Sequence, residues 1–216
     1  KDASAREAIV SAEANLQNED RASRFTIDAT LRDDGTLVVR PAWPDGRRRG
    51  GERCSVEIIA PALHGVVAET DNGSITLAGG TGDARLESSN GAIRVSDRRG
   101  GVLVRTSNGR IEIDRCVANL DLITSNGAVR IAGASPPQGQ AFDWRVATSN
   151  GAITVDLDRR PDARLSAWTS NGKARLLRRA GGESSAFLSG TSINFGEGPG
   201  EITLSTSNGS ITVRTP

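Results

Sequence analysis

Side chains that could do chemistry are few in this chain and stand far apart in the sequence. His64 is the single histidine, and neither Cys54 nor Cys116 has a metal-ligand or nucleophile motif around it. Any catalytic arrangement of the Ser-His-Asp or Cys-His kind would have to use His64, which follows Pro61 in a stretch that predicts a surface turn. We therefore expect no catalytic residues, no metal site and no cofactor. The cysteine spacing permits a disulfide but does not require one.

The best acidic candidates are Asp156 and Asp158, which would share one side of a strand because strand side chains alternate. Paired carboxylates are what polysaccharide lyases and hydrolases use, so such an enzyme is one alternative for this chain. Arg159 and Arg160 follow directly, however, and a structural ion pair explains the acidic residues more simply. We expect a protein that is not an enzyme.

A basic loop is the other polar feature outside the repeats. It runs from Arg40 to Arg53 and carries Arg47, Arg48 and Arg49, which could grip an anionic polymer or simply be solvated. The whole chain holds 27 Lys and Arg against 26 Asp and Glu, so it gives no electrostatic reason to expect nucleic acid. No apolar run approaches the ~18 residues of a membrane span. The start at Lys1 indicates a processed or truncated N-terminus.

An internal repeat must position all of these residues. The letters TSNG occur at 106–109, 124–127, 148–151, 169–172 and 206–209, with TDNG at 70–73 and SSNG at 88–91. Successive glycines are 18, 18, 18, 24, 21 and 37 residues apart, and the last interval fits two repeats if a degenerate copy lies near 189–191. The predicted structural corners are Asn72, Gly73, Asn90, Gly91, Asn108, Gly109, Asn126, Gly127, Asn150, Gly151, Asn171, Gly172, Asn208 and Gly209.

Each repeat predicts two short strands with one buried face. Val102, Val104 and Thr106 stand at alternate positions before Gly109, and Ile111 continues the alternation after it. The joint at the opposite end of the repeat, such as residues 96–101, is polar or rich in glycine. Insertions such as 134–139 also fall there, which predicts a variable, outward rim.

Asn-Gly is typical of a two-residue hairpin turn, so an antiparallel hairpin array is the alternative to stacked repeats. Stacking is favoured for two reasons. The two strands of a stacked repeat cover each other's apolar faces, and identical corner residues would form ladders of side-chain hydrogen bonds. We expect an all-β fold, a parallel β-solenoid or β-helix with two strands per repeat of about 18 residues. Its outward positions Arg94, Arg110, Glu112, Arg130 and Lys173, together with the basic loop, are the predicted binding residues.

The first third of the chain does not repeat cleanly and predicts an atypical N-terminal cap over 1–60, followed by the repeats over 61–216. Residues 4–16 fit a capped helix and a strand equally well. Residues 25–31 and 37–39 flank a turn and predict a hairpin. Residues 56–60 predict a strand that enters the first repeat.

The stretch from Cys54 to Pro61, followed by ETDNGSITL, SSNGAIRV and TSNGRIEI, resembles the bacterial putative-adhesin β-strand-repeat family. The resemblance covers roughly 54–216 and rests on structural motifs, so it carries over no functional residue. It implies an adhesin-like protein of the cell envelope or surface, either secreted or periplasmic. We therefore expect a binding or scaffold protein that presents a rigid polar face to a glycan or a cell-surface protein. The alternatives are the polysaccharide-processing enzyme and a solenoid that assembles with copies of itself.

Overall fold

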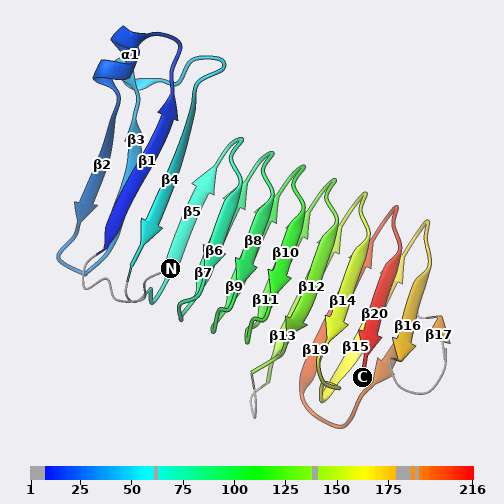
Figure 1. The fold of residues 1–216 in the computed structure, drawn as a ribbon. Coiled ribbons are helices and arrows are strands. Elements are labelled where there is room, and N and C mark those ends of the chain that lie inside the picture. Colours follow the sequence, from blue (N-terminus) through cyan, green and yellow to red (C-terminus); the bar gives the residue numbers. More distant parts are fainter. Residues whose placement is uncertain (1–7, 61–62, 138–140, 179–185, 188–189) are drawn as a thin grey trace. The chain divides into compact units, whose positions relative to one another are not determined.

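The computed structural model describes residues 8–60, 63–137, 141–178, 186–187 and 190–216. The chain divides into two compact units, Lys1–Pro61 and Ala62–Pro216, called here the N-terminal unit and the repeat unit. Both are built mainly of β-strands (Figure 1). Each unit is described by itself.

The N-terminal unit consists of two antiparallel strand pairs. Its elements are β1 (Ile9–Asn15), α1 (Glu19–Arg24), β2 (Thr26–Leu31), β3 (Leu37–Ala42), the 3₁₀ turn η1 (Pro44–Gly46) and β4 (Arg53–Ile59). The predicted hairpin is confirmed, because β2 pairs with β3. The helical alternative for residues 4–16 is wrong over 9–15, which form β1, and residues 1–7 lie outside the described residues. The strand at 53–59 pairs with β1 instead of joining the first repeat.

Among its described residues, the repeat unit contains seven repeats, each with one strand in each of two sheets. In chain order they are repeat 1 (β5, Val66–Thr70; β6, Ile75–Ala78), repeat 2 (β7, Ala84–Ser88; β8, Ile93–Ser96), repeat 3 (β9, Val102–Thr106; β10, Ile111–Asp114), repeat 4 (β11, Leu120–Thr124; β12, Val129–Ala134), repeat 5 (β13, Asp143–Thr148; β14, Ile153–Leu157), repeat 6 (β15, Ala163–Thr169; β16, Ala174–Arg178) and repeat 7 (β19, Gly200–Thr206; β20, Ile211–Thr215). The short strands β17 (Ala186–Phe187) and β18 (Thr191–Asn194) lie between repeats 6 and 7 in the sequence.

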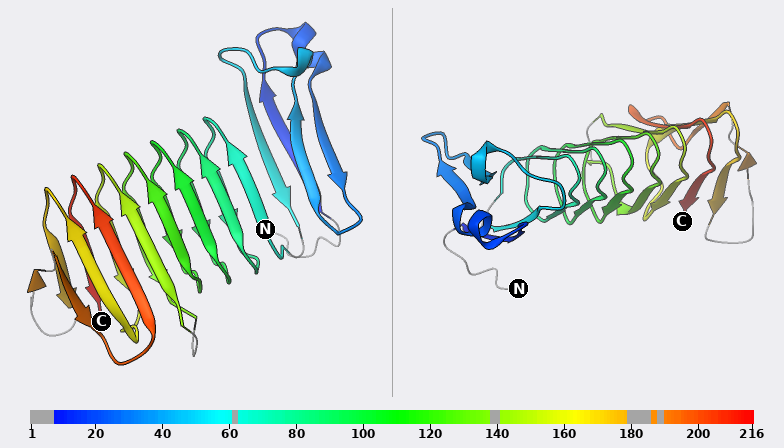
Figure 2. Two further views of the ribbon diagram at one scale, coloured as in Figure 1. Left: turned by 180° about the vertical axis from the view of Figure 1, so that it is seen from behind. Right: turned by 90° about the horizontal axis from the view of Figure 1, so that it is seen from above.

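Neighbouring repeats run parallel and in register. Sheet 1 has the order β18-β15-β19-β13-β11-β9-β7-β5, and sheet 2 has the order β17-β16-β20-β14-β12-β10-β8-β6. Val104, for example, stands beside Leu86 and Leu122, each exactly one repeat away. Figure 2 shows the parallel strands side by side. The antiparallel hairpin alternative is therefore wrong for these repeats.

The repeats do not stack in chain order throughout. Repeat 7 lies between repeats 5 and 6, because β19 pairs in parallel with both β13 and β15, and β20 pairs with both β14 and β16. The predicted degenerate copy near 189–191 is also wrong. Residues 191–194 form β18, which pairs antiparallel with β15, and residues 188–189 lie outside the described residues. Antiparallel β17 similarly follows the outer edge of β16.

The core of the repeat unit is a single apolar cluster contributed by both sheets. Valine, isoleucine, leucine and alanine at alternate strand positions are almost completely buried. The larger Trp144 is buried as well, and its indole N–H donates to the carbonyl of Ala118 at 2.8 Å. The period-2 pattern in the sequence thus places every second side chain of a strand in this cluster.

The opposite end of the repeat was expected to be an outward rim, and Arg98 corrects this. Its side chain is fully buried, and its guanidinium donates to the carbonyls of Thr81 at 2.9 Å and of Gly79 and Gly82 at 3.1 Å. Burial lowers the pKa of Arg98. In the next two repeats Cys116 and then Ala134 occupy the corresponding position, so this corner accommodates side chains of very different size.

Candidate functional site

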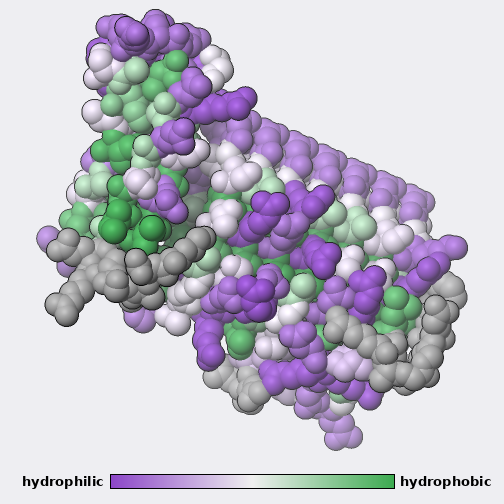
Figure 3. Space-filling view, viewed as in Figure 1, coloured by the Kyte–Doolittle hydropathy of each residue, from purple (hydrophilic) through white to green (hydrophobic). Residues whose placement is uncertain are grey.

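The predicted Asn-Gly corners lie in one continuous line of side chains. Each asparagine except Asn72 donates through Nδ2 to Oδ1 of the asparagine in the adjacent repeat, with all six distances between 2.7 and 2.8 Å. The line follows the spatial order, so Asn208 stands between Asn150 and Asn171. Figure 3 shows hydrophilic side chains in a regular row along this edge of the repeat unit.

Beneath the asparagines, a second set of bonds fixes the backbone of each corner. Thr124 Oγ1 accepts from the backbone N–H of Gly127 at 3.2 Å and donates to the carbonyl of Gly109 in the preceding repeat at 3.1 Å. Thr106 makes the same two contacts, and Thr148 donates to the carbonyl of Gly127 in its preceding repeat. The threonine hydroxyl therefore both closes its own turn and joins it to the corner of the preceding repeat.

Except at Gly73, the glycine of each corner is needed because the stacked backbones approach one another closely. A methyl group added to Gly109 would overlap the carbonyl oxygen of Gly91, and one added to Gly127 would overlap that of Gly109. The requirement here is steric, and these glycines do not have positive φ angles. The type I′ turn that Asn-Gly usually indicates is therefore absent at these two corners.

Three of the predicted binding residues at sheet 2 form ion pairs with one another. Glu112 accepts from Arg94 Nε at 2.5 Å and from Arg110 Nη1 at 3.1 Å. These guanidinium groups, Arg94 first, lower the pKa of the Glu112 carboxyl. Arg130 is exposed and stands next to Glu112 in strand register. Lys173 is exposed immediately before β16, in repeat 6, and so stands apart from the other four.

The basic loop belongs to the N-terminal unit and differs from its prediction. Residues 40–42 belong to β3, and the segment beyond them is fastened to Arg21 on α1. Arg21 is buried and donates to both oxygens of buried Glu52, at 2.6 and 2.9 Å. Glu52 also accepts from the backbone N–H of Arg49, and the Arg49 side chain pairs with Asp45. Part of the loop therefore serves structure.

The remaining two members of the predicted arginine cluster contribute differently. Arg47 is exposed, and its carbonyl accepts from Arg21 Nη2 at 3.0 Å. Arg48 is exposed beside it. The Arg21–Glu52 pair was missed by the sequence analysis, because the two residues are 31 positions apart and no local pattern joins them.

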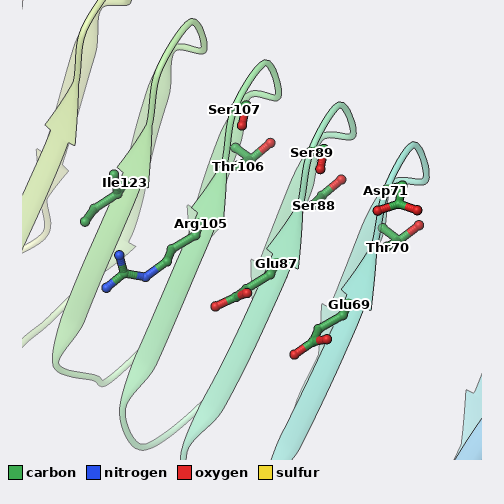
Figure 4. Close-up of a pocket in the computed structure, with 10 residues that line it drawn as sticks. All are labelled: Glu69, Thr70, Asp71, Glu87, Ser88, Ser89, Arg105, Thr106, Ser107 and Ile123. Atoms are coloured by element: carbon green, nitrogen blue, oxygen red, sulfur yellow. The ribbon is translucent and has the colours of Figure 1, made fainter.

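A shallow depression of about 430 Å³ lies on the outer surface of sheet 1, beside the corners of repeats 1 to 3 (Figure 4). The side chains of Glu69, Glu87, Arg105 and Ile123 leave successive strands toward the same side. Its remaining lining comes from the corner residues Thr70, Asp71, Ser88, Ser89, Thr106 and Ser107. It is the candidate site that the geometry favours.

The sequence analysis missed the acidic and basic residues of this depression, although the repeat register contains the signal. Glu69, Glu87 and Arg105 each stand four residues before a corner glycine, a position that alternates outward when its neighbours point inward. Arg105 reaches Asp121 on the next strand at 3.5 Å, and Glu87 pairs with Arg85 at 2.8 Å. The depression therefore offers carboxylates, a guanidinium and hydroxyls together.

The other candidates for chemistry are separate from this depression. Asp156 pairs with Arg214 on β20 at 3.0 Å, and Asp158 is exposed. His64 is exposed and lies 3.1 Å from the hydroxyl of Thr81. Both cysteines are free thiols, and burial raises the pKa of each. Within the described residues, no three or more metal-ligating side chains gather in one place.

No helix among the described residues has the length and apolar character needed to cross a membrane.

Comparisons with known proteins provide little support for assigning a function to this site. No family model matches the chain, and no curated protein matches it. Among solved structures, a putative cell adhesion protein from Clostridium sporogenes ATCC 15579 is similar at 14% identity and a TM-score of 0.38, over 96% of this chain and 83% of that one. At these values the likeness is too distant to assign a fold or a function.

Proposed function

We propose that the repeat unit is a parallel β-solenoid that acts as a non-enzymatic, adhesin-like binding scaffold of the bacterial cell envelope or surface. It presents a rigid polar face to a glycan or to a surface protein. The observation that carries this proposal is the continuous asparagine ladder, together with the threonine bonds beneath it. These bonds hold the outward side chains at the fixed spacing of the strands, so a ligand meets a surface that is already ordered.

The arrangement of charge supports binding over catalysis. A catalytic groove needs carboxylates that converge and are left available for proton transfer, with pKa values adjusted to that task. On sheet 2 the carboxylates are occupied by arginines of neighbouring strands, as Glu112 is by Arg94 and Asp156 by Arg214. Rows of opposite charge across the strands are what a structural face requires.

Direct binding measurements test the proposal. The purified protein is applied to a glycan array and to isolated bacterial envelope fractions, and its position in the cell is followed by fractionation. We expect saturable binding without conversion of the ligand, and recovery with the envelope or the medium. The matched variants Arg105→Glu on sheet 1 and Arg130→Glu on sheet 2 then identify the face used, because each reverses one exposed charge.

Three results would contradict the proposal. Release of shortened glycan chains during binding would instead support the polysaccharide-processing enzyme. Growth of the sedimenting species with protein concentration, in the absence of any ligand, would support self-assembly. Recovery with cytoplasmic proteins alone would remove the envelope role.

A further inference from the structure

One row of outward residues crosses sheet 1 from the depression to its far end. Each member stands four residues before a corner glycine and is the strand-register partner of the next. In spatial order the row reads Glu69, Glu87, Arg105, Ile123, Ala147, Ser205 and Trp168. Charged residues therefore occupy one end, short or aliphatic residues the middle, and an indole the other end.

Trp168 is the unusual member, because its indole is 56% exposed although the flanking Ala167 and Thr169 are buried. Its neighbour across the sheet on β19 is Ser205, a short side chain. On the β18 side, the backbone N–H of Gly190 bonds to the carbonyl of Ala167, and glycine has no side chain that could cover the indole. Large exposed aromatic surface of this kind is typical of binding sites.

The other tryptophans of the chain have packing roles. Trp144 is completely buried in the core and its N–H is bonded. Trp43 packs against Phe25 in the N-terminal unit, with ring centroids 5.0 Å apart. Neither side chain is as exposed to solvent as that of Trp168.

A parallel row of hydroxyls borders the row that ends in Trp168. Two residues further along each strand, the chain places Asp71, Ser89, Ser107, Ser125, Ser149, Ser207 and Ser170, all of them exposed. Figure 4 shows the first three of these beside Glu69, Glu87 and Arg105. Since the repeats are in register, these polar groups recur at the strand spacing of about 4.8 Å.

We propose that these two rows form a binding track for a linear, uncharged oligosaccharide, with one sugar ring stacked on Trp168. This inference rests on the proposed function and specifies its ligand and its face. A pyranose ring has an apolar C–H face suited to an indole, and hydroxyls that both donate and accept hydrogen bonds, as serine hydroxyls do. A protein partner would call for a continuous apolar centre, which the short and polar side chains around Trp168 do not supply.

Two features narrow the class of saccharide. Arg105 and Trp168 are separated by four strand spacings, roughly 19 Å, so the full track needs a chain of several sugars. Glu69, Glu87 and Asp71 stand at the far end, where their carboxylates would repel an anionic polymer. An uncharged glycan avoids that repulsion and still finds hydrogen-bond partners along the serines.

The test is a calorimetric titration with cello-, xylo-, malto- and chito-oligosaccharides, from disaccharide to octasaccharide. We expect affinity for one of these series to rise with length until the track is spanned. Trp168→Ala should weaken binding tenfold or more, and Trp168→Phe should recover part of the loss. Val67→Ala is the matched control, because Val67 is a 72% exposed apolar residue on the same sheet outside the row, and it should leave binding unchanged.

The possible results separate this inference from the proposed function. If the protein binds a glycan but Trp168→Ala binds it equally well, or if length has no effect, the track is wrong and the scaffold role stands. If none of the four series binds while a surface protein or an anionic glycan does, the uncharged saccharide is wrong. If the protein binds neither glycans nor envelope fractions, both proposals fail.

Discussion

The two units of this chain are held together in different ways. In the N-terminal unit, the largest fully buried side chain is Arg21, paired with buried Glu52, while apolar residues such as Ile9 and Ile58 remain exposed. In the repeat unit, a column of aliphatic side chains is buried and most charges lie outside. One unit thus contains a buried polar centre, and the other many similar contacts between neighbouring repeats.

This difference determines how each unit should fail. Breaking a buried ion pair leaves one uncompensated charge, so a single event can disrupt the whole N-terminal unit. A stack of repeats distributes its stability over successive interfaces, and damage is most serious where it prevents two repeats from approaching. The four predictions below test this comparison, beginning with the largest expected effect.

Gly109→Ala should have the largest effect, because the new methyl group would overlap the carbonyl oxygen of Gly91 and force repeats 2 and 3 apart. We expect a loss of about 3 kcal/mol or more in the free energy of unfolding of the repeat unit, measured by urea denaturation. Gly35→Ala in the N-terminal unit is the control. Gly35 has positive φ but open surroundings, so its substitution should cost only about 1 kcal/mol. Equal losses would contradict the steric explanation.

Acid should loosen the N-terminal unit before the repeat unit. The Arg21 guanidinium lowers the pKa of Glu52 from 4.5 to about 2. The depressed pKa means that the pair stabilises the folded unit fully above pH 4.5, and that this contribution is lost as the pH falls from 4.5 toward 2. Fluorine NMR of fluorotryptophan-labelled protein can follow Trp43 and Trp144 separately.

The Trp43 signal should change first in this titration, and the Trp144 signal should persist to lower pH. The variant Glu52→Gln serves as control, because it removes the carboxylate: its Trp43 signal should already differ at neutral pH and should show no early acid transition. Simultaneous changes of the two signals would show that the units do not differ in this way.

Thr124→Val should cost about 1–3 kcal/mol, because it keeps the shape of the side chain but leaves the N–H of Gly127 and the carbonyl of Gly109 without their buried partner. Thr124→Ser, which keeps the hydroxyl, should cost less. Thermal unfolding of the two variants measures the difference. If valine proved as stable as threonine, the hydroxyl would not join the repeats.

The smallest effect is expected for Asn108→Ala. Its amide bonds to Asn90 and Asn126 are exposed to water, so their loss should cost only about 0.5–1 kcal/mol. Amide hydrogen exchange at the corners of repeats 2 to 4 would detect the interrupted asparagine ladder. Local opening should increase at these corners while the core strands stay protected. Exchange that increased throughout the unit would mean that the ladder carries more of the stability than its exposure suggests.

Much of the repeat unit could be predicted from the sequence, because one period of side-chain alternation decides which residues are buried. Val104 and Ile111 occupy the expected inward positions, and Asn108 stacks on its equivalents in the adjacent repeats. The same repeat register also identifies the outward row that stands four residues before each corner glycine. The sequence analysis nevertheless did not single out Glu87 and Trp168 as binding residues. Their importance arises only when strands that are distant in the sequence lie side by side.

Two features could not be predicted from local pattern. The identical corners at Asn150, Asn171 and Asn208 are chemically able to stack in any order, so the sequence does not show that the last of them lies in the middle. The Arg21–Glu52 pair likewise joins residues from a helix and a distant loop. In both cases the deciding contact is remote along the chain.

The central position of repeat 7 also bears on how the molecule is made. A ribosome delivers residues 163–178 before residues 200–215, although the later segment is the one that pairs with repeat 5. The mature order therefore requires that the edge of repeat 5 stay open until the later segment arrives. During biosynthesis, the repeats therefore cannot simply stack one after another in the order in which they are synthesised.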